Sequence, residues 1–153
     1  MLKNPKNPVK AIVDLQEENV LLKKQVETLQ KDKAKNLMGE LINIAESING
    51  INYLAVKLDL DQNSIKDLAF DLGNKIENLF LLVGTEADGK AFLTCFIAKN
   101  LVEEKQLDAG KVVRELGKLI EGGGGGQAYF ATAGGKKPEG IEQALIKGKD
   151  FIV

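Results

Sequence analysis

The chain has 153 residues, of which 44% are hydrophobic and 28% are charged, a composition typical of a soluble globular protein rather than a disordered or fibrous one. It contains no histidine and one cysteine, which excludes serine–histidine and cysteine–histidine catalytic pairs, imidazole-based zinc sites and an internal disulfide. The formal net charge of −1 argues against a nucleic-acid binder that is basic throughout, so any contact to RNA would need local basic patches.

Several features predict a cytoplasmic protein with no membrane segment. No run of about 18 apolar residues occurs, and the first ten residues lack the apolar stretch of a secretory signal. The single Cys95 fits a reducing compartment, and its apolar neighbours predict a buried structural thiol rather than a nucleophile. Residues 1–8, which contain Pro5 and Pro8, predict an extended linker, as expected for a fragment of a longer protein.

Residues 9–36 predict a helical stalk with a coiled-coil-like seam. Apolar side chains recur at alternating intervals of three and four, with leucine at each clear d position. An asparagine at an a position costs stability but fixes register, so the pattern predicts a homo-oligomer formed through the stalk. Packing of the stalk against its own domain is the alternative. The predicted oligomerisation residues are Ile12, Leu15, Asn19, Leu22, Val26 and Leu29.

Residues 37–153 predict one small globular domain, and its hairpins are marked by turn dipeptides. Two β-rich runs flank Asn49-Gly50, which accepts the positive φ values of a type I′ turn. The runs NLFLLVGT and GKAFLTCFIA predict two more strands joined at Asp88-Gly89. These segments predict two hairpins.

Helical spacing predicts the remaining elements of this domain. A helix is expected over residues 61–76, with Asp61 or Asn63 as its cap, and another from Asp108 to a glycine end at Gly122. The sequence therefore predicts an α+β fold, with a mainly antiparallel sheet covered by helices on one face.

Five consecutive glycines precede a predicted strand at Gln127–Ala133, followed by Gly134-Gly135, two lysines and a final helix. The glycine spacing matches neither the P-loop nor the GxGxxG pattern, so ATP and dinucleotide sites are not supported. Glycine exposes backbone amides and allows close approach of a polynucleotide backbone; a tightly packed loop is the alternative. Strand alternation places Tyr129 and Phe130 on opposite faces, and one of them could stack on a base.

The chain has a heptad helix followed by the segments DLGNKIENLFLLVGT and VVRELGKLIEGGGGGQAYFATAGGKKPEGIEQAL. This order resembles the C-terminal C-Ala (DHHA-type) domain of bacterial alanyl-tRNA synthetases over nearly the whole chain. The resemblance implies a module that grips the elbow of tRNA and dimerises through its helix, supporting aminoacylation and editing by domains absent from this chain. ATP and zinc are expected only in those domains. One departure stands out: the family commonly has Arg-Pro-Asp-Met-Ala-Gln where this chain has Gln127–Thr132, which removes a basic residue.

No catalytic residue, metal ligand or cofactor is expected in this chain, and tRNA is the expected partner. A purely dimerising appendage is the first alternative. An accessory domain of a phosphoesterase is the second, although such proteins also need a metal-binding Asp/His domain. The candidate RNA-binding residues are Gly123, Gly124, Gly125, Gly126, Tyr129, Gly134, Gly135, Lys136 and Lys137.

Overall fold

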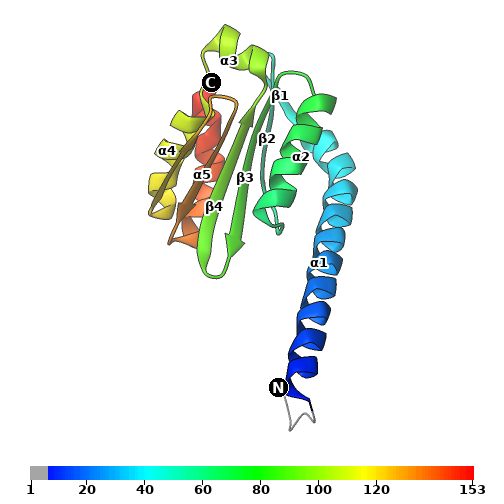
Figure 1. The fold of residues 1–153 in the computed structure, drawn as a ribbon. Helices are drawn as coiled ribbons and strands as arrows, with labels where there is room; N and C mark the ends of the chain where they lie inside the picture. The colour runs from blue at the N-terminus through cyan, green and yellow to red at the C-terminus, as the bar shows by residue number, and fades with distance from the viewer. Residues whose placement is uncertain (1–6) are drawn as a thin grey trace.

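The computed structural model describes residues 7–153, so most of the predicted linker lies outside the described residues. A long N-terminal helix leads into a six-stranded sheet packed with helices (Figure 1). Within this part of the chain, no helix is both long and apolar enough to cross a membrane. The elements are α1 Pro8–Ile44, β1 Glu46–Ile48, β2 Ile51–Lys57, α2 Gln62–Lys75, β3 Leu79–Ala87, β4 Lys90–Ile97, α3 Lys99–Lys105, α4 Ala109–Gly117, η1 Lys118–Ile120, β5 Gly122–Gly126, β6 Phe130–Gly135, η2 Pro138–Gly140, α5 Ile141–Lys147 and η3 Gly148–Phe151.

The predicted α+β fold with a mainly antiparallel sheet is confirmed. The strands lie in the order β1-β2-β3-β4-β6-β5, and every neighbouring pair is antiparallel except β2 and β3. Helix α2 forms the crossover between these two parallel strands, as a parallel connection requires. Strands β1 and β5 are therefore the two edges of the sheet.

Helices cover both faces of the sheet, which corrects the expectation of helices on one face. Helices α4 and α5 pack on one face, and α2 with the C-terminal part of α1 packs on the other, giving two separate apolar cores. The cause is visible in β3, where Leu79–Val83 are all buried without alternation. A continuous apolar run of this kind is typical of a strand buried on both faces.

Helix α1 continues to Ile44, beyond the predicted end near residue 36. The coiled-coil seam stops there, but Ala34 and Leu41 begin a second buried stripe, 8% and 3% exposed, that packs against the body. Gly39 lies within this helix, at a position where an added Cβ would meet no atom within 4 Å. Tertiary packing thus extends a helix through residues whose β-rich composition predicted a strand.

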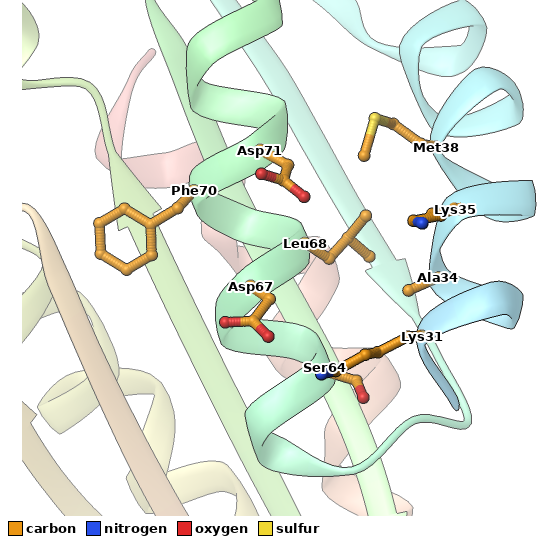
Figure 2. Close-up of a pocket in the computed structure, with 9 residues that line it drawn as sticks. All are labelled: Lys31, Ala34, Lys35, Met38, Ser64, Asp67, Leu68, Phe70 and Asp71. Atoms are coloured by element: carbon orange, nitrogen blue, oxygen red, sulfur yellow. The ribbon is translucent and has the colours of Figure 1, made fainter. Parts of the chain in front are cut away.

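The joint between α1 and α2 fixes the stalk to the body. Figure 2 shows Leu68 of α2 directed toward Ala34 and Met38 of α1, with Lys35 and Asp71 beside this contact. The groove between the two helices has a volume of about 270 Å³. Only the C-terminal part of α1 takes part, and its N-terminal part projects away from the sheet (Figure 1).

Local signals in the sequence form as predicted. Asp61 caps α2 by accepting a hydrogen bond from the Ser64 amide at 2.8 Å, and Asp108 caps α4 by accepting from the Lys111 amide. The turns at Asn49-Gly50 and Asp88-Gly89 both have positive φ at their two central residues. The sequence did not predict the short helix α3, and the left-handed residue that ends η1 is Glu121 rather than the glycine after it.

Candidate nucleic-acid interface

The five glycines form an edge strand of the sheet, not the loop expected from their composition. Strand β5 pairs with β6 from Gly122↔Gly135 to Gly126↔Ala131. The predicted strand at Gln127–Ala133 is displaced toward the C-terminus, because Gln127 starts a turn and exchanges backbone hydrogen bonds with Phe130. Glycine is normally depleted in strands and shows no side-chain alternation, so only pairing with β6 defines this strand.

The glycines of β5 fall into two alternating classes. A Cβ atom added at Gly122 would lie 1.9 Å from the Gly134 carbonyl oxygen, and one at Gly124 would lie 2.2 Å from the Thr132 carbonyl oxygen. Gly126 is similarly crowded by β6. In contrast, Gly123 and Gly125 have no atom within 4 Å of an added Cβ. Close packing against β6 therefore requires glycine at positions 122, 124 and 126. Open space lies beside the backbone at positions 123 and 125.

Helix α4 lies along β5 through two glycines of its own. A Cβ added at Gly110 would lie 3.3 Å from the Gly126 carbonyl oxygen, and one at Gly117 would lie 3.5 Å from the Gly122 carbonyl oxygen. These contacts make α4 run antiparallel to β5 along its whole length. The exposed side of α4 consequently flanks the glycine strand.

That exposed side carries the acid Glu115 and three basic residues: Lys111, Arg114 and Lys118. The basic residues are separated by three and four positions, which places them on one face of the helix and its following turn. A terminal guanidinium nitrogen of Arg114 lies 3.5 Å from the Cβ position at Gly110, so this cation lies beside the Gly126 end of β5. The sequence analysis missed these residues, although their spacing on a predicted helix was the available signal.

Lys136 and Lys137 follow β6 directly and lie at the opposite end of β5, where Gly135 pairs with Gly122. Both side chains are exposed, and among residues 7–153 neither forms an ion pair. Glu121 and Glu139 lie close in sequence to these lysines and reduce the local positive charge. We call the surface formed by the following residues the glycine face: Gly122–Gly126, Lys111, Arg114, Lys118, Lys136 and Lys137.

The structure divides the candidate RNA-binding residues into two places. Gly134 and Gly135 pair with β5 and belong with the glycine face, as do the two lysines that follow them. Tyr129 lies in the turn at the other end of β6, beside Lys99. Tyr129 and Lys136 are seven positions apart across β6, or about 23 Å at the usual rise. Tyr129 therefore lies away from Lys136 and Lys137, at the Gly126 end of the β5–β6 hairpin.

The predicted oligomerisation residues lie on the projecting part of α1. Ile12, Leu15, Leu22, Val26 and Leu29 are between 46% and 68% exposed, and the Asn19 side chain is also exposed. Within the described residues, none of the six belongs to either apolar core of the body. The seam is thus an apolar surface available to a second helix.

The lone cysteine is part of the core, as predicted. Cys95 is fully buried on β4 facing α4, and its thiol is free. Burial raises the pKa of the Cys95 thiol, and the negative charge of Asp108 raises it further. A thiol that stays protonated is not a nucleophile, so Cys95 carries no chemistry here.

The chain is similar to known proteins over nearly its whole length. The DHHA1 domain matches residues 50–153. The alanine–tRNA ligase of Christiangramia forsetii is 60% identical over 151 residues, covering 99% of this chain, and that of Flavobacterium psychrophilum is 43% identical over 152 residues. The chain spans 17% of the length of each of these relatives.

The fold is also similar to a solved structure, the crystal structure of the C-Ala domain from Aquifex aeolicus alanyl-tRNA synthetase. The two structures match with a TM-score of 0.63 at 24% sequence identity, over 70% of this chain and 96% of the other. The family resemblance inferred from the sequence is confirmed by these matches. The chain belongs to the DHHA1 domain family.

Proposed function

We propose that this chain is the tRNA-binding module of a cytoplasmic alanine–tRNA ligase and that it contacts the tRNA elbow through the glycine face. The observation that carries the proposal is a largely exposed strand without side chains, with Arg114 beside its Gly126 end, Lys136 and Lys137 following the residue paired with Gly122, and further basic residues on the exposed side of α4. Backbone free of side chains lets a ribose–phosphate backbone approach closely, and lysine and arginine then bind its phosphates. The match to alanine–tRNA ligases supports alanine tRNA as the partner.

Binding of this kind recognises shape and backbone rather than base sequence. The module would therefore bind different tRNAs and raise the effective concentration of the acceptor end near the catalytic and editing domains of the ligase. The proposal places no catalytic centre, ATP site or zinc site in this chain.

The test is binding of the chain to intact alanine tRNA, an unrelated tRNA and an acceptor-stem hairpin without an elbow, at two salt concentrations. Both tRNAs should bind and the hairpin should not. The variant Lys136→Glu/Lys137→Glu should weaken binding and reduce the slope of log K against log salt by about 1.5 to 2. A control with the same charge change on other surfaces, Lys10→Glu/Lys66→Glu, should retain more affinity. No binding to any RNA would overturn the proposal.

We further propose that the exposed seam of α1 pairs with the seam of a second copy in parallel and in register. In that arrangement Asn19 meets Asn19 of the second copy, so the two amides satisfy each other in the interface. Glu18 then occupies a g position facing Lys23 of the second copy at an e position, which forms a favourable charge pair on each side.

Cross-linking tests both the pairing and its direction. An Ile12→Cys variant places a thiol near the start of the seam, and the native Cys95 is buried and does not interfere. In a parallel pair the two introduced thiols are adjacent, and oxidation should give a covalent dimer. In an antiparallel pair Ile12 faces Leu29, and the thiols lie about 25 Å apart. A concentration-dependent dimer that does not cross-link would refute the parallel arrangement.

A further inference from the structure

A second surface on this domain has the features of a pocket for a single base. It is a groove of about 630 Å³ where the C-terminal end of α2, the end of β4, the start of α3 and the turn between β5 and β6 meet. Binding pockets for small ligands commonly have volumes of about 300 to 1,000 Å³. The groove contains Tyr129, which the glycine face does not include.

Aromatic rings line the apolar part of the groove. Phe96 and Phe70 contact each other edge to face with ring centroids 5.4 Å apart, and Phe70 stacks on Phe130 at 5.5 Å. Gly73 makes room for this cluster, because a Cβ added there would lie 2.4 Å from the tip of the Phe96 ring. Packing fixes the parts of the Phe70 and Phe96 rings that line the groove, and this apolar surface can contact the face of a planar ring.

Amide side chains provide the polar part of the groove. Asn78 has a left-handed backbone conformation with φ of 52°, and its side-chain oxygen accepts a hydrogen bond from the Asn100 amide group. This bond orients both side chains, and it leaves both N–H donors of Asn78 and one N–H donor and the side-chain oxygen of Asn100 free for a ligand. Asn74 adds a third amide at the end of α2. Adjacent donors and acceptors of this kind match the hydrogen-bonding edges of nucleobases.

Tyr129 forms the wall of the groove nearest to the glycine face. Its side chain is 37% exposed, and the Lys99 ammonium group lies 5.8 Å from the centre of its ring. An exposed aromatic ring offers a stacking surface for a base, and the lysine lies where it can bind the attached phosphate. Tyr129 follows Gly126 by three residues, so the chain between them spans at most about 11 Å. One RNA strand can therefore contact both surfaces.

The charge of the groove distinguishes it from the glycine face. Lys99 and Glu77 are the ionised side chains that line it, and their charges cancel. A neutral groove with an aromatic surface and amides favours a base over a phosphate chain. We propose that this groove binds one unstacked base of the RNA whose backbone lies on the glycine face, an inference that rests on the proposed function.

The experiment compares RNA binding by three variants of the full chain. Tyr129→Leu removes the stacking ring and should weaken tRNA binding about tenfold, whereas Tyr129→Phe keeps the ring and should stay within about threefold of the unmodified chain. Asn100→Ala, an exposed position, should weaken binding about threefold to tenfold. A short single-stranded RNA and the same ribose–phosphate chain without bases serve as probes, and only the former should be sensitive to Tyr129→Leu.

Fluorescence gives a second readout. The chain has two tyrosines and no tryptophan, and Tyr53 is only 3% exposed, so quenching on addition of RNA reports mainly Tyr129. If the unmodified chain binds no RNA, both proposals fail. If Lys136→Glu/Lys137→Glu weakens binding while Tyr129→Leu and Asn100→Ala do not, the glycine face stands and the base pocket is wrong. Equal loss for both probes in Tyr129→Leu also refutes the pocket, because the ring would then act on the backbone alone.

Discussion

The two classes of glycine in β5 predict unequal effects of the same substitution on stability. In Gly124→Ala the new methyl group would lie 2.2 Å from the Thr132 carbonyl oxygen and 2.5 Å from the Ala133 Cα atom, whereas in Gly123→Ala it would meet nothing within 4 Å. An ordinary contact is longer by more than 1 Å, and the atoms in the way belong to the backbone. Strand β5 must therefore move away from β6.

The size of the effect follows from the hydrogen bonds that this movement breaks. Loss of one bonded pair on the ladder costs about 1 to 3 kcal/mol, which is also the usual cost of overpacking. For a chain of this size, about 1 to 3 kcal/mol lowers the melting temperature by about 2 to 12 °C. Gly123→Ala should change the melting temperature by less than about 2 °C, since a compatible Gly→Ala change alters stability by under about 1 kcal/mol.

Thermal unfolding followed by circular dichroism, at one fixed protein concentration, measures this difference. Amide hydrogen exchange in β6 provides a second readout, because local opening of the hairpin would expose those amides without lowering the melting temperature. Equal melting temperatures and equal exchange in Gly123→Ala and Gly124→Ala would refute the assignment of the glycines to two classes.

Three further changes test other parts of the structure. Leu41→Ala, at a site only 3% exposed, should lower the free energy of unfolding by about 2 to 4 kcal/mol in urea titrations. Leu29→Ala, at a site 68% exposed, should change the free energy of unfolding of the monomer by less than about 0.5 kcal/mol. Asn19→Leu should tighten self-association in sedimentation experiments while giving a mixture of oligomers; weaker association would refute the seam. Because burial raises the pKa of the Cys95 thiol, the thiol loses its proton at lower pH in the unfolded chain than in the folded one. The free energy of unfolding should therefore fall above about pH 8.5, and it should fall less in Cys95→Ala. Urea unfolding at several pH values measures this difference.

Local sequence signals predicted many elements of the fold correctly. Asn49-Gly50 and Asp88-Gly89 formed the expected turns, and Asp61 formed the expected cap. These signals act within a few residues, through backbone conformations and hydrogen bonds that neighbouring residues complete by themselves. Much of the order of elements followed from them.

Long-range packing decided what these signals could not. Residues 37–44 are helical because Leu41 and its neighbours pack against α2, although their composition is β-rich. The glycines of β5 form a strand only because β6 pairs with them, and no side-chain pattern in the sequence predicts that pairing.

The candidate site shows the same division between sequence and structure. The sequence by itself indicated part of the candidate site, because bare glycine backbone, lysine and tyrosine have chemistry that does not depend on the fold, but it did not indicate Lys111, Arg114 and Lys118. Only the tertiary structure decided which of them act together, since it set Arg114 beside Gly126 and placed Tyr129 at the far end of β6 from Lys136. Proximity between residues distant in sequence comes from sheet order and helix packing, which a single sequence does not encode locally.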